Sequence, residues 1–288
     1  IAEFYKSDPI GGGEIKETEK NKEIELKFKG ENYEHILRIL ISTYISGFKI
    51  IKIKGNEKLD ENIIKAVEKF RNLVSGYEIV DEKVNEIVLQ DISNPLELLP
   101  DKLLERMYNL TENMVRDSYI TIKNNDIELG KEIMNRDLQV DKIYLTISRQ
   151  LFHKLRSPSS IEGFDSTTIE NIRYVAKSLE RISDHAVNMA SLAGEFKNIR
   201  ENVFDDFFNQ TLNLLKNSYL SFENHNAEMA NEIIDKIEEN VSKIRDFIRK
   251  EKKIDNVYFS LLDSIIRILR YSQDICETAI NDKYLKLS

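Results

Sequence analysis

The sequence predicts a mainly α-helical protein in which two tandem three-helix bundles follow a small α/β domain. Three observations predict this fold class. The stretch that begins at Thr111 recurs without a gap at Thr211, an offset of 100 residues. Only 10 Gly and 4 Pro interrupt the 288-residue chain, which favours long helices. The alternation of apolar and charged residues that is typical of strands changes to helical periodicity near Pro95.

The first part of the chain is predicted to form the small α/β domain, residues 22–93, in the order βαβαββ. Ile24, Leu26 and Phe28 alternate with charged residues, which is typical of a half-buried strand. The predicted elements are strands at 23–29, 48–54, 77–80 and 84–89 and helices at 32–46 and 60–74. We expect one sheet with helices on one face. Residues 1–21, with three consecutive glycines and a charge-rich stretch, are predicted to be a tail or linker.

Every later segment is predicted to be helical. The first bundle spans residues 94–196 and the second bundle spans residues 197–288. Turns at Asn125–Asp126 and at 224–226 occupy matching positions between the first two helices of each bundle. The predicted helices are 101–123, 127–156 and 167–195 in the first bundle and 201–223, 227–250 and 255–283 in the second.

The two bundles align at an offset of 100 residues over their first two helices and at an offset of 89 over the third. Identical residues that support the alignment are Thr111 and Thr211, Ser118 and Ser218, Tyr119 and Tyr219, Arg181 and Arg270, Ser183 and Ser272, and Ala190 and Ala279. A shift of the third helix by one residue would instead place Asp274 opposite Asp184. The sequence leaves both registers of that helix open.

Four acidic residues of the first bundle have no acidic counterpart in the second. Asp137, Asp141, Glu180 and Asp184 align with Ile237, Val241, Leu269 and Gln273. The second bundle therefore serves as an internal control, which indicates that the fold does not need these acids. Their joint absence from the second bundle suggests that the four acids act together.

The spacing of these acids predicts a metal site. On each helix the two carboxylates are four residues apart and lie one turn from each other, so they repel and raise each other's pKa. A bound cation removes that penalty, and oxygen ligands suit hard or borderline ions. The predicted ligands are Asp137, Asp141, Glu180, Asp184 and Asn188. For the acids of the third helix, surface ion pairs with Arg173 and Lys177 are the alternative.

Composition excludes several other classes of protein. The net charge of −8 argues against a nucleic-acid-binding surface, which needs clustered Lys and Arg. The single cysteine, Cys276, excludes an intramolecular disulfide and a multi-thiolate zinc site, and its apolar surroundings predict a buried position. No apolar run reaches the roughly 18 residues that a membrane span needs. We expect a cytoplasmic protein that forms a homodimer.

The third helix of the first bundle carries the motif Glu-Arg-Ile-x-Asp-His-x-x-Asn at residues 180–188, and RDLQVDKIY precedes it at 136–144. These motifs and the tandem bundles resemble the PhoU family of phosphate-signalling regulators over about residues 98–284. The resemblance implies that the four acids and Asn188 bind a metal ion or cluster, with iron or zinc as the metal. Magnesium and manganese, which oxygen ligands also suit, are the alternatives. It also implies docking on a phosphate-transport ATPase or a signalling component.

The α/β segment is similar to that of archaeal PhoU members, which often begin with an AbrB-type DNA-binding hairpin. Residues 1–21 are too short and irregular for such a hairpin, so DNA binding is not expected of this chain alone.

Two classes of function are consistent with a carboxylate site in a helical bundle. The first is a metal-binding regulator of phosphate uptake or signalling that docks on a protein partner. The second is a ferritin-like metalloenzyme or storage protein, which requires Glu-x-x-His motifs inside one four-helix bundle. No Glu-x-x-His occurs anywhere in the chain, and we find no nucleophile, phosphate loop or acid–base histidine. The sequence therefore favours the regulator over an enzyme.

Overall fold

The computed structural model divides the chain into two compact units. Residues 15–18, 21–93, 98–156, 164–195, 201–251 and 255–285 are described. The first unit comprises Ile1–Leu98 and Ser148–Gly163, and the second comprises Leu99–Ile147 and Phe164–Ser288. No helix in the described ranges combines the length and the apolar character that crossing a bilayer requires.

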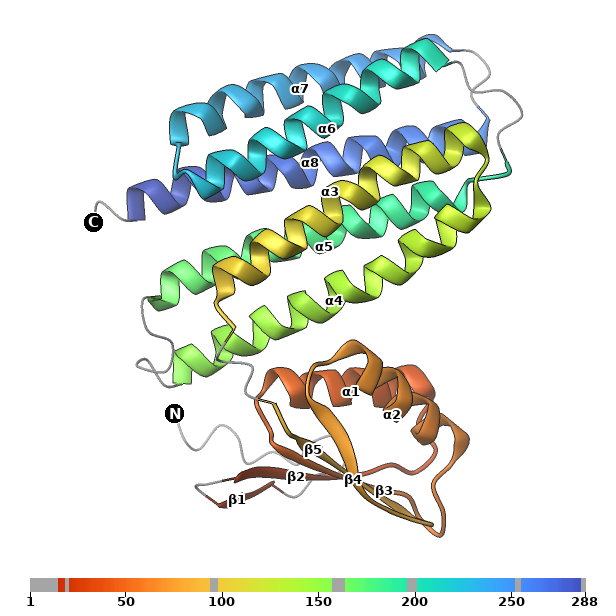
Figure 1. Cartoon of the computed structure of the whole chain (residues 1–288), viewed down its shortest axis with the longest axis vertical. Helices are drawn as coiled ribbons and strands as arrows, with labels where there is room; N and C mark the ends of the chain where they lie inside the picture. The colour runs from red at the N-terminus through yellow and green to blue at the C-terminus, as the bar shows by residue number, and fades with distance from the viewer. Residues whose placement is uncertain are drawn as a thin grey trace. The chain divides into compact units, whose positions relative to one another are not determined.

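The first unit is built on a five-stranded sheet in the order β1-β2-β3-β5-β4. Its elements are β1 (Ile15–Thr18), β2 (Asn21–Lys27), α1 (Tyr33–Ile45), β3 (Ile50–Lys54), α2 (Glu61–Leu73), β4 (Tyr77–Lys83) and β5 (Glu86–Asp91). Strands β2 and β3 are parallel, and the other neighbours are antiparallel. Helices α1 and α2 pack together and cover one face of the sheet (Figure 1). The predicted small α/β domain is confirmed.

The sheet face that bears the helices is apolar because alternate strand residues point toward it. Ile24 and Leu26 of β2 and Ile51 and Ile53 of β3 are buried. The next residues along each strand carry charges, and Lys52 Nζ lies 2.5 Å from Glu23 Oε1 across the β2–β3 pair. The alternation in the sequence therefore predicts the buried face correctly.

Strand β1 lies inside the segment that is predicted to be a tail. Ile15 pairs with Ile24 and Thr18 pairs with Asn21, in antiparallel register. The other residues of the predicted tail, 1–14 and 19–20, lie outside the described residues. The short strand escapes sequence analysis because an edge strand is held by backbone hydrogen bonds, which need no apolar alternation.

The two bundles form one compact unit rather than two. Their helices are α3 (Pro100–Asn124), α4 (Ile127–Arg156), α5 (Ser166–Ser191), α6 (Glu201–Glu223), α7 (Ala227–Lys250) and α8 (Asn256–Leu285). Helix α3 packs along α5, α5 packs against α8, and α8 packs against both α6 and α7 (Figure 1). A single apolar core runs through these helices. The predicted helices and the mainly helical fold class are confirmed, but residues 148–156 of α4 belong to the first compact unit.

The repeat is visible in the backbone of the two bundles. Helix α3 ends at Asn125 with φ 57°, and α6 is followed by His225 with φ 50°. Immediately after these residues, Asp126 Oδ1 accepts a hydrogen bond from the backbone N of Leu129, and Asn226 Oδ1 accepts one from the backbone N of Met229, each at 3.0 Å. Each bundle therefore makes the turn between its first two helices with a left-handed residue and a capping side chain.

Aromatic rings join the two bundles in a reciprocal arrangement. Tyr108 stacks on Tyr219 with ring centroids 3.9 Å apart, and Tyr119 stacks on Phe208 at 4.2 Å. At the offset of 100 residues, Tyr119 corresponds to Tyr219 and Tyr108 to Phe208. The same two positions of each bundle therefore contact the other bundle. This contact pattern is expected of two halves that are related by a two-fold axis.

Burial decides the register of the third helices. At the offset of 89, buried residues face buried residues: Leu179 and Ile268, Ser183 and Ser272, Ala186 and Ile275, and Ala190 and Ala279. At an offset of 90, the buried Ser183 would align with Gln273, which is only half-buried. The alignment that places Gln273 opposite Asp184 is therefore confirmed.

Candidate functional site

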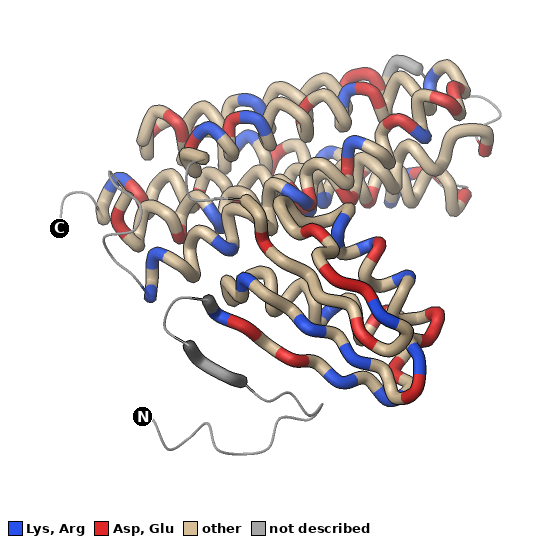
Figure 2. Tube along the Cα trace, turned by 60° about the horizontal axis from the view of Figure 1, so that its bottom comes forward, with Lys and Arg blue, Asp and Glu red and all other residues tan. Residues whose placement is uncertain are grey.

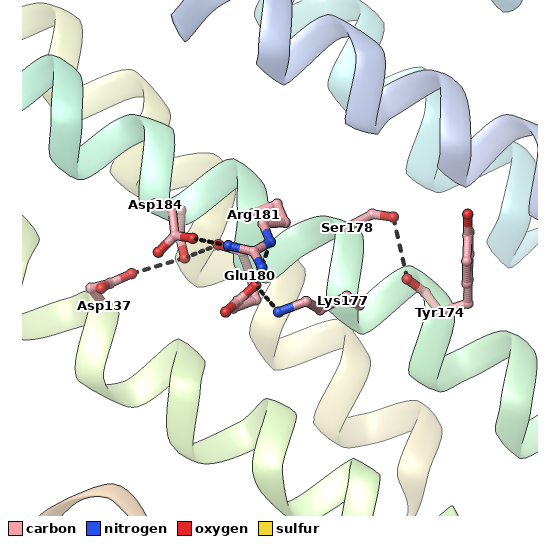
Figure 3. A network of polar contacts seen from close by, with 8 residues as sticks. Asp137, Tyr174, Lys177, Ser178, Glu180, Arg181 and Asp184 are labelled. Carbon is pink, nitrogen blue, oxygen red and sulfur yellow. Dashed lines mark hydrogen bonds and ion pairs between the residues drawn. The ribbon is translucent and has the colours of Figure 1, made fainter. Parts of the chain in front are cut away.

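The acids of the first bundle meet along the seam between α4 and α5. Asp137 Oδ1 on α4 accepts a hydrogen bond of 2.9 Å from Ser183 Oγ on α5. Glu180 and Asp184 lie on α5 on either side of this serine, and Figure 3 shows Asp137 pointing from α4 toward them. Helical spacing produces the cluster, because residues three and four apart share one face. The structure therefore brings three of the predicted ligands together.

Two basic side chains neutralise the acids of α5. Lys177 Nζ lies 2.7 Å from Glu180 Oε2, and Arg181 Nη1 lies 3.2 Å from Asp184 Oδ2. The charge of Glu180 raises the pKa of the Arg181 guanidinium, and Asp184 adds to this effect. The alternative of ion pairs is thus observed for both acids. Arg181 takes the place expected of Arg173, which lies 3.7 Å from Glu170.

The remaining predicted ligands lie at the edges of this cluster. Asp141 is half-buried on α4, one turn beyond Asp137, and Asn188 is exposed on α5, one turn beyond Asp184. Within the described part of the chain, no group of three or more His, Cys, Asp or Glu side chains is arranged to hold a metal ion. The oxygen donors are of the type that a hard cation takes. Coordination by them requires Lys177 and Arg181 to move aside, and the metal site stays a prediction.

At the positions that correspond to these acids, the second bundle has mostly apolar side chains. Ile237, Val241 and Leu269, the counterparts of Asp137, Asp141 and Glu180, are buried in the common core. Burying a side chain of this size contributes about 1.5–3 kcal/mol to stability. The first bundle forgoes this contribution at three positions, so the acids there are not explained by the stability of the core.

Arg181 and Arg270 have the same structural role in the two bundles. Arg270 Nη2 lies 3.1 Å from Glu238 Oε2 on α7, and its Nη1 donates a 2.7 Å hydrogen bond to Gln273 Oε1. In the first bundle Arg181 pairs with Asp184, the counterpart of Gln273. Both arginines therefore pair with an acid.

His185 and Cys276 belong to the interior rather than to the cluster of acids. The His185 ring stacks on Tyr271 of α8 with centroids 6.0 Å apart, and burial lowers the pKa of its imidazole. Cys276 is fully buried, and burial raises the pKa of its thiol. Neither side chain therefore has the environment of a metal ligand or an activated nucleophile.

Sequence analysis missed Ser183, whose side chain connects α5 to α4 by a hydrogen bond. Ser183 joins α4 to α5 through Asp137, yet the sequence marks it only as a residue that both bundles share. Its counterpart Ser272 donates to the backbone O of Ile268, as Ser183 does to Glu180 O. The signal that could have found it is a small polar residue within the apolar stripe of α5, facing the Asp137 position.

The comparisons with known proteins place this site within a recognised domain. Residues 104–193, which include α4 and α5 of the site, match the family model of the PhoU domain. This match supports the PhoU family. The matching segment carries every predicted ligand from Asp137 to Asn188.

Curated relatives match over the same segment. A protein of Caulobacter vibrioides named "Phosphate-specific transport system accessory protein PhoU homolog" is 31% identical over 90 residues, which are 31% of this chain and 37% of the relative. A Zymomonas mobilis protein of the same name is 30% identical over 101 residues, 35% of this chain and 41% of the relative. The match thus spans well under half the length of these PhoU homologues.

The helical part also has the fold of a solved PhoU protein. The crystal structure of the phosphate transport system regulatory protein PhoU from Streptococcus pneumoniae superposes with a TM-score of 0.53 at 19% identity. The superposition covers 65% of this chain and 93% of that protein. At this identity the likeness concerns the fold alone, and the likeness to archaeal members stays a prediction.

Proposed function

We propose that this chain is a regulatory accessory protein of phosphate transport that acts by docking on a protein partner. The observation that carries the proposal is the PhoU-domain match over residues 104–193, which coincides with the acidic seam. The tandem bundles, with the fold of a phosphate transport regulatory protein, support it further. The partner we propose is the phosphate-transport ATPase or a signalling component of the same system.

The proposed docking is tested with purified components. The full chain is expected to bind the phosphate-transport ATPase subunit encoded in the same genome with a Kd of about 1 μM, typical of a regulated contact. Binding is measured by isothermal titration calorimetry, and the ATPase subunit of an unrelated transporter is the control. Equal binding to both ATPases, or to neither, together with unchanged phosphate uptake in a strain that lacks the gene, would contradict the proposal.

We further propose that the seam between α4 and α5 binds a divalent metal ion, iron or zinc in the first instance, with magnesium or manganese as alternatives. Asp137, Glu180 and Asp184 would supply oxygen ligands, with Asp141 and Asn188 at the periphery. The ion would replace the positive charges of Lys177 and Arg181, which are 35% and 47% exposed at their side chains. Lys177 would also leave the Tyr144 ring, whose centroid lies 4.8 Å from its Nζ. The Arg181–Asp184 pair is exposed on both sides, so its exchange costs little, whereas the Glu180 carboxylate is only 13% exposed and needs the ion in place of Lys177.

The ferritin-like alternative is less well supported. Such sites place Glu-x-x-His pairs inside one four-helix bundle, and this sequence has no such pair. Oxygen-dependent oxidation of added Fe²⁺ at a rate above that of buffer would be the observation in favour of this class. We propose a regulator without enzymatic activity.

Sequence-specific DNA binding is not expected of this chain alone. Its charge is −8, and acidic and basic residues interleave along the helices and strands that are drawn (Figure 2). We expect only weak retention of a promoter fragment, at about 10⁻⁴–10⁻⁶ M in ~0.15 M salt, as for non-specific binding. Gel-shift titration checks this expectation, and nanomolar retention that survives competitor DNA would contradict it.

A further inference from the structure

The second bundle has a basic groove between α7 and α8. It has a volume of about 500 Å³ and is lined by four arginines and one acid. The arginines are Arg245 and Arg249 on α7 and Arg267 and Arg270 on α8. Four of the fourteen arginines of an acidic protein thus converge on one groove. We propose that this groove binds a small organic phosphate of the nucleotide class.

Ion pairs leave the groove with positive charge in excess. Arg249 lies 3.3 Å from Asp246, Arg267 lies 3.8 Å from Asp263, and Arg270 pairs with Glu238. Among the described residues Arg245 has no ion pair, so four guanidinium groups meet three carboxylates. The pairs of Arg249 and Arg267 are exposed, and a multiply charged ligand displaces such pairs readily.

Guanidinium groups suit phosphoryl oxygens in particular. Their planar arrangement of donors makes paired, charge-assisted hydrogen bonds with phosphate oxygens. A phosphoryl group carries up to two negative charges and presents three strong acceptors, so two such groups engage several arginines at once. The arginines approach from two helices, which allows one ligand to lie between them.

Apolar residues in the groove indicate that the ligand has an apolar or aromatic part besides its phosphates. Ile248, Phe259 and Ile266 line the same groove. The Phe259 side chain is 52% exposed, which leaves a ring face beside the arginines for a planar ring to stack on. A volume of about 500 Å³ falls in the range of small-molecule sites and exceeds what one inorganic phosphate fills.

The first bundle lacks two of the four groove arginines and the aromatic ring. At the offsets of the repeat, Arg249 and Arg270 correspond to Arg149 and Arg181, so two of the four arginines are shared. Arg245 and Arg267 instead correspond to Leu145 and Ser178, and Phe259 corresponds to Glu170. The first bundle thus differs from the second by four acids, and the second differs from the first by two arginines and one aromatic ring in this groove. Arg245, Arg267 and Phe259 are therefore dispensable for the repeated fold, which is the same argument that singles out the acids.

Calorimetric titration of the full chain in EDTA tests the proposal, since EDTA removes any metal from the first bundle. ATP is the probe, and tripolyphosphate and adenosine represent its two halves. We expect saturable binding of ATP at ~0.15 M salt and at least about tenfold weaker binding of each half. The Arg245→Gln/Arg267→Gln variant should lose at least about tenfold in ATP affinity. Phe259→Ala should bind ATP no better than tripolyphosphate.

The matched control is Arg106→Gln, which removes an exposed arginine of α3 outside the groove and should leave ATP affinity within about twofold. Three results would overturn the proposal. They are no saturation by about 1 mM ATP, an unchanged affinity in a folded double variant, and tripolyphosphate binding as tight as that of ATP. If the double variant does not fold, Phe259→Ala alone decides the outcome. A failure here leaves the docking and metal proposals standing, since those concern the first bundle.

Discussion

Replacing Asp137 and Asp184 by Asn is expected to lower the affinity for divalent metal by well over tenfold, since even outer residues of metal sites contribute about 10–100-fold. The variant removes one anionic ligand from each helix of the seam. The amide oxygen introduced by Asp137→Asn can still accept a hydrogen bond from Ser183, so the contact between α4 and α5 is kept. At a metal concentration of 100 Kd, the native chain should gain about 2.7 kcal/mol in unfolding free energy, and a variant with about 100-fold lower affinity should gain only about 0.4 kcal/mol. Elemental analysis after dialysis and thermal melts measure the two effects.

The control for this variant makes the same charge change in the second bundle. Asp274→Asn/Glu277→Gln also removes two acids one turn apart, and it should leave metal content and metal-dependent stabilisation unchanged. Lys177→Gln should raise the metal affinity, because its ammonium group no longer competes for Glu180. If the Asp137→Asn/Asp184→Asn variant retains full metal content, the acids form only the ion pairs described above, and the site assignment fails.

Replacing Asp91 by Ala is expected to destabilise the α/β unit by about 3–5 kcal/mol, because it leaves a buried arginine without its counter-ion. Asp91 Oδ2 lies 2.6 Å from Arg149 Nη2, with the two side chains only 2% and 7% exposed. The Arg149 guanidinium also lies 4.7 Å from the Tyr44 ring centroid and 5.5 Å from that of Tyr77. Hydrogen exchange of the β3 and β5 amides reports the stability of this unit separately from the helices.

A matched exposed pair in the same unit provides the control. Lys65 and Glu61 are four residues apart on α2, with side chains 59% and 79% exposed. Lys65→Ala should cost no more than about 0.5 kcal/mol. The double change Asp91→Ala/Arg149→Met should recover part of the loss, because it removes both charges together. A loss of under about 1 kcal/mol for Asp91→Ala would show that the buried pair is not what attaches residues 148–156 to the sheet unit.

The helices illustrate how far periodicity alone carries a prediction. The predicted helix at 227–250 and the observed α7 have the same bounds, and the predicted helix at 101–123 differs from α3 by one residue at each end. Caps and turn residues mark these ends in the sequence, and an apolar stripe marks the interior, so local chemistry suffices. By contrast, β1 has no such local mark, since its partner β2 supplies the hydrogen bonds that define it.

The candidate site was predictable in part. The missing acids of the second bundle identified Asp137, Glu180 and Asp184, and the structure brings these three together around Ser183. The ion pairs with Lys177 and Arg181 were only an alternative in the sequence, because the rotamers of long side chains depend on neighbours that spacing does not reveal.

The sequence by itself determined the helical repeat, the small α/β domain, the bounds of most helices and the acids that distinguish the first bundle. Only the tertiary structure decided that the two bundles share one core through the Tyr108–Tyr219 and Tyr119–Phe208 stacks, and that Arg149 is buried against Asp91. It also brought Arg245 and Arg267, on different helices, to one groove. The physical reason is that periodicity and capping act between residues within a few turns. Stacking, buried ion pairs and grooves join residues that are distant in the chain, and packing alone brings these together.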